Sequence, residues 1–437
     1  MKYQGKVLFV NLTSGEIRSE EVPEVLVRKF LGGRGMNMYY LYKLLPPDTD
    51  PLSPENPLIM GLGLVTGTKA PSSSRFNITA KSPESLILGD SNIGGHWPAA
   101  IRDAGFQCLI FTGRAERPVY LHIEKGEAEL KDAAHMWGTN VHDFLEILER
   151  DFGRGAKAGF ITRAGERQVR MAGVMGGKKA IAARGGLGAV MGSKNLKAVI
   201  ATGRGGVEYF DEAAAGKHRK EQNAYLVQAK VIGVLGKYGT PLLYRPSNVL
   251  GAIRTKNSQL NAWDDTLVAE EIDKRVTKMA SCFNCVVHCR ARNDVDDARG
   301  HTGGEGPEYS SIGTLGSNLG VSGTENVIRL SNLCNELGLD TSSAGSIIAW
   351  AIELYEKGIV TPEMTGGREL RFGDYDLIVD LLNDISERRG FGDVLADSTQ
   401  AWKAFGEASK DYLIASKGLT QTDPHDPRIL KGFALGL

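Results

Sequence analysis

Residues 278–290, KMASCFNCVVHCR, hold three of the chain's five cysteines: Cys282, Cys285 and Cys289 are spaced as C-x2-C-x3-C. Such tight spacing lets one turn of backbone aim three thiolates at one point, as a soft metal ion or an iron–sulfur cluster requires. The pattern favours a four-iron, four-sulfur cluster, and a structural zinc ion and reduced structural cysteines are the alternatives. The zinc alternative is less favoured because no second Cys/His pair with knuckle spacing follows. His288 is a poor fourth ligand because it lies directly beside Cys289 and would have to bend back sharply toward the same ion.

The composition around this stretch is that of a globular, cytoplasmic protein. At 437 residues and 42% hydrophobic residues, the chain can form about two to three domains with sizeable cores. Lys+Arg and Asp+Glu number 52 each, so no net field favours nucleic acid or an anionic membrane. Five cysteines, three of them clustered, indicate a reducing compartment rather than a disulfide framework. We find neither a signal peptide nor a run of about 18 apolar residues that could span a bilayer.

The part of the chain before residue 206 is predicted to be mostly β. Residues 6–12 and 16–22 alternate around a Thr-Ser-Gly turn, which predicts a hairpin. From residue 57 onward, short apolar runs are separated by Gly, Pro or polar clusters, as in a chain of short strands. Helices are also predicted in this part of the chain, at residues 24–31, 36–45, 98–103 and 139–150.

From residue 206 onward, the apolar residues recur at intervals of three and four, which indicates helices. The predicted helices span residues 212–230, 267–279, 326–337, 344–357, 375–388 and 394–405. The sequence therefore predicts an α+β fold. Residues 1–205 would form a β-rich domain, and residues 206–410 a helical domain with the cysteine cluster on a loop after one of its helices.

Glycine is abundant, and its clusters mark candidate sites for anionic oxygen. The chain has 54 glycines, about twice the average share of about 7%. Residues 66–77 combine hydroxyls with Arg75, and residues 90–96 open onto a predicted helix at 98–103. Residues 183–197 contain G-G-x-G and a distant G-S-K, but match neither a P-loop nor a dinucleotide-binding fingerprint. Each cluster can equally be an ordinary turn or helix cap.

Several segments together resemble the tungsten-containing aldehyde ferredoxin oxidoreductases. They are SPENPLIMGLGLVTGTKAPSSSRFNITAKSP, the Asn-Ile-Gly-Gly turn at residues 92–95, RGGLGAVMGSKNLKAV, the cysteine pattern followed by EGPEYSSIGTLGSNLG, and NELGLD. The resemblance runs in order along the whole chain. It implies a two-sheet β domain that carries the pterins, followed by mostly helical domains.

The resemblance also implies the chemistry and the partners. Members of this family bind a bis-pterin tungsten cofactor, occasionally with molybdenum, whose two phosphates are joined through magnesium. A four-iron, four-sulfur cluster lies beside it. They oxidise an aldehyde to the carboxylic acid and pass the electrons to ferredoxin. A homodimer is a family-level expectation, although Arg329 stands where a dimer-bridging glutamate would be.

Site residues follow by position from the same resemblance. Arg75 would lie between the cluster and a pterin, and the Asn92 carbonyl would hold magnesium. The residues of the pterin-phosphate loops would be Gly94, Gly95, Arg184, Gly185 and Gly186, with Lys178 or Lys179 replacing a basic residue that is missing at Ala180. The pterin amines would be bound by Asn335 and Asp340, and the cluster by Cys282, Cys285 and Cys289.

Two departures from the family pattern bear on catalysis. The glutamate that follows E-G-P-E-Y in the aldehyde enzymes is Ser310 here, so water activation is expected to fall to Glu308, Glu305 or His301. Each of the two glutamates can equally be a surface or helix-capping residue. The substrate, and the choice between tungsten and molybdenum, stay open.

The other departure lies at the end of the chain, which stops before the family's fourth cluster cysteine and second pterin motif. Residues 411–437 are accordingly expected to begin a third, truncated helical domain. Cys108 and Cys334 do not match the fourth ligand and are predicted to be small buried thiols. Two other functions stay open: a non-catalytic cofactor- or cluster-binding electron-transfer subunit, and a zinc-stapled binding module.

Overall fold

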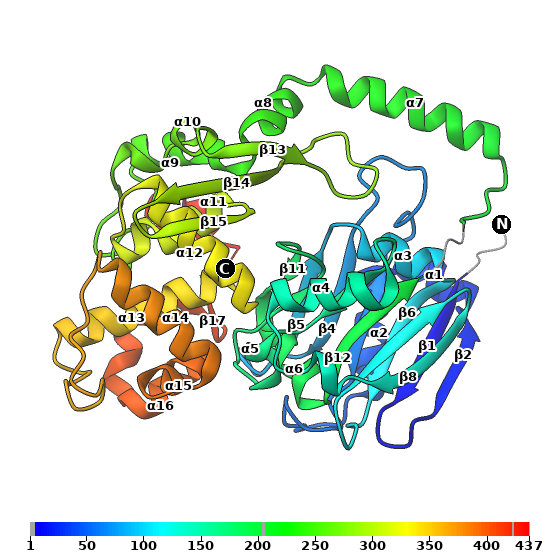
Figure 1. The fold of residues 1–437 in the computed structure, drawn as a ribbon, viewed down its shortest axis with the longest axis horizontal. Helices are drawn as coiled ribbons and strands as arrows, with labels where there is room; N and C mark the ends of the chain where they lie inside the picture. The colour runs from blue at the N-terminus through cyan, green and yellow to red at the C-terminus, as the bar shows by residue number, and fades with distance from the viewer. Residues whose placement is uncertain (1–4, 203–205, 422–423, 437) are drawn as a thin grey trace. The chain divides into compact units, whose positions relative to one another are not determined.

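The computed structural model describes residues 5–202, 206–421 and 424–436 (Figure 1). The chain forms two compact units. The first comprises Met1–Ile232 and Ser281–Val287, and the second Gly233–Ala280 and His288–Leu437. The first unit is rich in strands and the second is mostly helical, which confirms the predicted α+β class. The finer division at residues 205 and 410 stays a prediction, and residue 205 lies outside the described residues.

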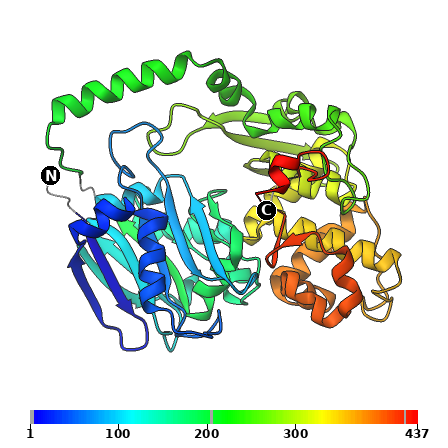
Figure 2. The same ribbon diagram turned by 180° about the vertical axis from the view of Figure 1, so that it is seen from behind.

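The first unit contains a six-stranded sheet with the order β2-β1-β6-β3-β4-β5. The predicted hairpin is confirmed as its edge, visible in dark blue in Figure 2. β1 pairs with β6 in parallel, and the other neighbours are antiparallel. The strands are β1 (Lys6–Asn11), β2 (Ile17–Glu21), β3 (Leu58–Leu62), β4 (Phe76–Lys81), β5 (Leu88–Ile93) and β6 (Phe106–Thr112).

A second six-stranded sheet in this unit repeats the topology of the first strand for strand. Its order is β8-β7-β12-β9-β10-β11, and its first and last strands in the chain, β7 and β12, again pair in parallel. The strands are β7 (Val119–Glu124), β8 (Glu127–Asp132), β9 (Lys157–Phe160), β10 (Val174–Met175), β11 (Ile181–Ala182) and β12 (Leu196–Thr202). The β-rich unit is therefore two copies of one strand arrangement, which the sequence patterns did not indicate.

The repeat extends to the connection before the last strand of each sheet. In the first half, Gly94-Gly95 follows β5 and precedes helix α3 (Trp97–Asp103), which leads into β6. In the second half, Gly185-Gly186 follows β11 and precedes helix α6 (Leu187–Ser193), which leads into β12. Two of the three glycine clusters thus occupy equivalent positions.

Both sheets contribute to one apolar core. Trp97, at the start of α3, is fully buried and lies edge-on to Phe76 of β4, with 4.9 Å between ring centroids. The same ring would lie 2.1 Å from a Cβ atom at Gly159 of β9, so any side chain there would displace the tryptophan. A glycine in the second sheet thus makes room for an aromatic anchor from the first half, and this contact ties the two halves together.

The two lysines of the G-S-K segment are structural. Both Lys194 and Lys197 are fully buried. Lys197 Nζ lies 2.5 Å from a Glu166 carboxylate oxygen, and Lys194 Nζ donates to the carbonyl oxygens of Pro54 (3.0 Å) and Gly113 (3.1 Å). Neither ammonium group is therefore available to a phosphate.

Most of the predicted helices are confirmed within a few residues. In the first unit they are α1 (Glu24–Phe30), α2 (Gly33–Leu44), α4 (Val141–Phe152) and α7 (Glu212–Gln228). In the second unit they are α12 (Thr324–Leu337), α13 (Thr341–Glu356) and α14 (Tyr375–Glu387), and the last predicted helix is divided into α15 (Phe391–Ala396) and α16 (Trp402–Phe405). Among the helices of the described ranges, none is long and apolar enough to cross a membrane.

The prediction of a helix at residues 267–279 is wrong. Only Ala269–Asp273 (α10) is α-helical there, and Val276–Ala280 forms strand β13. β13 pairs with β14 (Arg290–Asp297), which pairs with β15 (Gly300–Glu305) in a three-stranded antiparallel sheet. Pairing with a neighbouring strand overrides a local helical period. The cysteine stretch therefore connects two strands and does not follow a helix.

Because Lys194 is buried, we expect the stability of the protein to depend on pH. Desolvation, partly offset by Glu55, lowers the pKa of Lys194 to about 8. Between pH 8 and the unfolded pKa of about 10.4, the unfolded chain holds more protons at this site, so its contribution to stability rises with pH. We expect the free energy of unfolding of the wild type, measured relative to Lys194→Met, to rise by up to about 3 kcal/mol across this range. Parallel pH dependences in denaturant titrations of the two proteins would contradict this assignment.

Candidate functional site

The cysteine loop, residues Ser281–Val287, belongs to the first unit although the strands that flank it, β13 and β14, belong to the second. On one side, the Phe283 amide donates to the carbonyl oxygen of Gly95 at 2.9 Å. On the other side, Asn284 Nδ2 donates to the carbonyl oxygens of residues 69 and 70 at 2.9 and 2.7 Å. The loop is thus held between the first Gly-Gly turn and the 66–75 loop.

Two sulfur atoms of this loop make specific contacts with the first unit. The Ser72 hydroxyl donates to Cys285 Sγ at 3.3 Å. Cys282 Sγ would lie 3.1 Å from a Cβ atom at Gly94, so a side chain at that position would press on the sulfur. A hydrogen bond to sulfur and a glycine beside it are features of a site built around thiolate ligands. Both residues therefore fit the role of cluster ligands.

The other cysteines have different surroundings. Cys289 is half-buried and falls in the second unit. Cys108 and Cys334 are fully buried, as predicted, and burial raises the pKa of both thiols. Within the described part of the chain, no three His, Cys, Asp or Glu side chains lie in positions to hold one metal ion.

The two Gly-Gly loops lie against the same strand of the first unit. The Arg184 amide donates to Ser91 Oγ of β5 at 3.2 Å. Gly185 and Gly186 have φ values of 76° and 68°, and a Cβ atom at Gly186 would lie 2.2 Å from the Arg170 carbonyl oxygen. Only glycine fits that turn without strain. The structure thus brings the second Gly-Gly loop against β5, the strand that leads into the first loop about 90 residues earlier in the chain.

Arg75, directly before β4, is an available positive charge of the first unit. Its side chain is exposed, and it has no hydrogen-bond or ion-pair partner within the ranges that the structure describes. The other polar groups of the 66–77 cluster are engaged: Ser72 contacts sulfur, the Ser73 hydroxyl donates to the Thr68 carbonyl at 2.9 Å, and the Asn77 amide donates to Asp90. The predicted convergence of hydroxyls on an anion is therefore not what the structure shows.

Asn92 and Lys179 complete the first-unit candidates. Asn92 is exposed at the end of β5, and its Oδ1 accepts from Asn77 Nδ2 at 3.3 Å. Lys179 is half-buried in the connection between β10 and β11. Its sequence position places an ammonium group five residues before Arg184, on the approach to the second Gly-Gly loop.

In the second unit, Asp340 and Asn335 are both buried. Asp340 caps helix α13: its carboxylate accepts from the Ser342 amide at 3.0 Å and from the Ser343 hydroxyl at 2.9 Å. Asn335 Nδ2 donates to the Glu305 carbonyl at 3.2 Å, which fixes the amide with its acceptor oxygen on the other side. Capping leaves further lone pairs on the Asp340 oxygens, so an acceptor role toward an amine is compatible with the cap.

The three catalytic candidates of the second unit have separate partners. Glu305 is buried and is the counter-ion of Arg290 and Arg292. His301 is exposed on β15, with Nε2 2.5 Å from an Asp294 carboxylate oxygen. Glu308 accepts a hydrogen bond from the Thr240 hydroxyl at the start of helix α11 (Tyr309–Leu315). Glu305 has a clear structural role, so of the two glutamates Glu308 is the better candidate.

Sequence reasoning missed His425. Its Nδ1 lies 3.1 Å from the Tyr309 hydroxyl, and the two rings are 5.2 Å apart. The Tyr309 amide donates to Thr240 Oγ1 at 3.0 Å, and the same threonine hydroxyl donates to Glu308. Tyr309 and His425 are 116 positions apart in the chain, so no local spacing connects them. The only signal in the sequence was a lone histidine between two prolines, in Asp-Pro-His-Asp-Pro.

Comparison with known proteins places these features in a family. The model "Aldehyde ferredoxin oxidoreductase, N-terminal domain" matches residues 7–203, and "Aldehyde ferredoxin oxidoreductase, domains 2 & 3" matches residues 217–437. The tungsten-containing aldehyde ferredoxin oxidoreductase of Pyrococcus abyssi is 36% identical over 446 residues, which cover 99% of this chain and 72% of the relative.

More distant relatives have other activities in their names. The aliphatic sulfonate oxidoreductase, WOR-like subunit, of Pyrococcus furiosus is 32% identical over 464 residues, which cover 99% of this chain and 71% of that protein. A chain from the active site complex BamBC of benzoyl coenzyme A reductase, solved with 1,5-dienoyl-CoA, superposes with a TM-score of 0.86 at 28% identity. That superposition covers 97% of this chain and 67% of the solved chain. With both halves matched by its models, the chain belongs to the aldehyde ferredoxin oxidoreductase family of oxidoreductases.

Proposed function

We propose that this protein is a bis-pterin tungsten or molybdenum enzyme that oxidises an aldehyde to a carboxylic acid and passes the electrons through a four-iron, four-sulfur cluster to ferredoxin. The observation that carries the proposal is the attachment of the cysteine loop to the first Gly-Gly turn. The Gly95 carbonyl accepts from the loop, and Gly94 leaves room for Cys282 Sγ. A loop suited to phosphate and a loop suited to iron thus share one turn of backbone.

The duplicated β topology supports a cofactor with two similar halves. Gly94-Gly95 and Gly185-Gly186 hold equivalent positions in the two copies, and each could approach one of two pterin phosphates. Arg75, Arg184 and Lys179 would supply positive charge to these phosphates. The Asn92 carbonyl would add an oxygen ligand for magnesium, which prefers hard oxygen donors.

The chain's residues fit the two redox groups in separate ways. Cys282 and Cys285, with Cys289, would supply thiolates to the cluster, and Asn335 and Asp340 would accept hydrogen bonds from pterin amines. When bound, the pterin-held metal supplies two-electron chemistry and the cluster supplies one-electron transfer. The protein has to hold these groups, admit an aldehyde and water, and remove protons.

Proton removal is the step for which the second unit provides residues. Oxidation of an aldehyde by water yields the carboxylic acid, two electrons and two protons. In the tautomer in which His425 Nδ1 donates to the Tyr309 oxygen, Nε2 of the imidazole carries the lone pair and can take one proton. Glu308, held by Thr240 beside Tyr309, offers a second acceptor in the same segment. We propose these two residues as the general bases, in place of the expected glutamate at position 310.

The direct test is turnover by the full chain. Protein purified without oxygen should reduce methyl viologen when a panel of aliphatic and aromatic aldehydes is added, and should form the matching carboxylate. Viologen reduction without carboxylate, or carboxylate without loss of the aldehyde, would exclude aldehyde oxidation. Absence of turnover with every aldehyde, in protein that contains tungsten and iron, would favour the electron-transfer subunit.

Replacing the proposed proton acceptor should slow turnover without removing the cofactors. We expect His425→Asn to lower kcat about 100-fold or more, since a positioned general base contributes at least that factor. Tyr309→Phe should lower kcat less, because it removes only the partner of the imidazole and keeps the ring. His142→Asn, at an exposed histidine on α4, is the matched control. A wild-type kcat in His425→Asn would contradict the assignment.

The Ser72 hydroxyl should affect the potential of the cluster. A donor to a ligand sulfur stabilises the more negative, reduced state, so Ser72→Ala should lower the reduction potential. Each kcal/mol of lost stabilisation corresponds to roughly 40 mV for a one-electron couple. Ser73→Ala removes a neighbouring hydroxyl that contacts the Thr68 carbonyl and should leave the potential unchanged. Redox titration followed by electron paramagnetic resonance measures both variants, and equal potentials in the wild type and Ser72→Ala would refute the role of this bond.

A further inference from the structure

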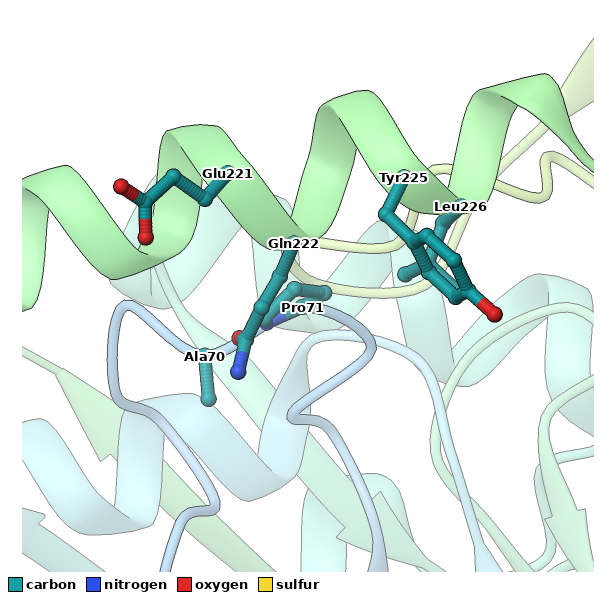
Figure 3. Close-up of a pocket in the computed structure, with 6 residues that line it drawn as sticks. All are labelled: Ala70, Pro71, Glu221, Gln222, Tyr225 and Leu226. Carbon is teal, nitrogen blue, oxygen red and sulfur yellow. The ribbon is translucent and has the colours of Figure 1, made fainter.

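A groove in the first unit lies between the 66–75 loop and helix α7 (Figure 3). Its volume is about 540 Å³. Ala70 and Pro71 line one side, and the α7 residues Glu221, Gln222, Tyr225 and Leu226 line the other. No described residue of α7 is buried, and Tyr225 is 77% exposed. A helix of 17 residues that has no buried residue and exposes Tyr225 beside the groove presents a surface for contact.

The groove is connected to the cysteine loop through hydrogen bonds of Ser72 and Ala70. Pro71 directly precedes Ser72, whose hydroxyl donates to Cys285 Sγ at 3.3 Å. The Ala70 carbonyl accepts from Asn284 at 2.7 Å. A molecule seated in the groove would therefore touch the segment that contacts a cluster ligand. Short separation between redox centres is what electron transfer between proteins requires.

Helix α7 is anchored to the same loop at its start. The Lys69 amide donates to the Tyr209 hydroxyl at 2.6 Å, and the Lys69 ammonium pairs with Glu212. Asp211 caps the helix by accepting from the Ala214 amide at 2.8 Å. The helix and the loop are thus connected by specific bonds at one end of the groove, which sets where the helix begins relative to the loop.

The exposed surface of α7 carries unpaired positive charge one turn before the groove. Residues 217–220 read Lys-His-Arg-Lys, and all four are exposed. Glu221 lies 3.9 Å from the Lys217 ammonium and 3.5 Å from the His218 ring. Arg219 and Lys220 have no hydrogen-bond or ion-pair partner within the described ranges. A partner with negative charge opposite Arg219 and Lys220 would be attracted to this face.

We propose that the α7 groove, with Arg219 and Lys220 at its edge, docks an acidic one-electron carrier protein of the ferredoxin type. This inference rests on the proposed function, since the carrier takes electrons from a cluster at Cys285. Each oxidised carrier accepts one electron from the reduced cluster and leaves reduced, so two carriers are reduced for each aldehyde oxidised. A small apolar centre at Pro71 and Tyr225 with a charged rim is the usual character of a weak electron-transfer interface.

The test compares Arg219→Glu/Lys220→Glu with Lys403→Glu, a charge reversal at an exposed lysine of helix α16. The probe is a purified acidic bacterial ferredoxin, titrated into the full anaerobic chain. We expect the double variant to bind it about tenfold more weakly at low salt, and the difference to shrink as salt is added. Lys403→Glu should bind as the wild type does, and methyl viologen should be reduced at wild-type rate by all three proteins.

Each other outcome has a defined meaning. Unchanged ferredoxin affinity in the double variant would overturn the docking site. So would a change from dimer to monomer in the double variant without a change in affinity, because the face would then belong to a second copy. Lys220→Glu alone, which leaves more of the helix intact, repeats the comparison if the double variant does not fold. Wild-type protein that binds ferredoxin but reduces no viologen with any aldehyde would defeat the proposed function and leave the docking site standing.

Discussion

The attachment of the cysteine loop to the Gly94-Gly95 turn is the constraint on which the candidate site depends. One residue of this turn accepts the Phe283 amide, and the other leaves space for the Cys282 sulfur. Any side chain at Gly94 would press on a sulfur atom at 3.1 Å. Because the same turn begins one of two equivalent phosphate-type loops, the position of the thiolates is coupled directly to that of the loop. A change in the Gly94-Gly95 turn would therefore also displace the cysteine loop.

The duplicated sheet arrangement explains how such a turn is held. Each half of the first unit ends in a Gly-Gly turn, a seven-residue helix and a buried strand. Trp97 packs between Phe76 and Gly159, so the helix after the first turn is anchored in both sheets. Burial of a whole tryptophan contributes several kcal/mol. The loops that would meet the cofactor therefore follow strands of a rigid core and are held by it, which is the arrangement that favours precise binding.

Local features of the sequence predicted much of the fold and part of the site. Tight cysteine spacing, glycine clusters and apolar periods depend on neighbours in the chain, and they identified the β half, the helical half and the cysteine loop. The strand at Val276–Ala280 was missed because pairing with β14 outweighs its local period. The Tyr309–His425 contact joins residues 116 positions apart, and the roles of Lys194 and Ser72 depend on burial and on a distant partner. Such information is tertiary, and a single sequence does not carry it.

The metal content of the purified chain tests the central claim most directly. Protein prepared without oxygen should contain about four iron atoms and about one tungsten or molybdenum atom per chain, with the spectrum of a reduced cluster after dithionite is added. In Cys285→Ser the cluster spectrum should be lost and iron should fall, whereas Ser73→Ala should keep both. Zinc in place of iron, bound to Cys282 and Cys285, would contradict the account, as would iron content that is unchanged in Cys285→Ser.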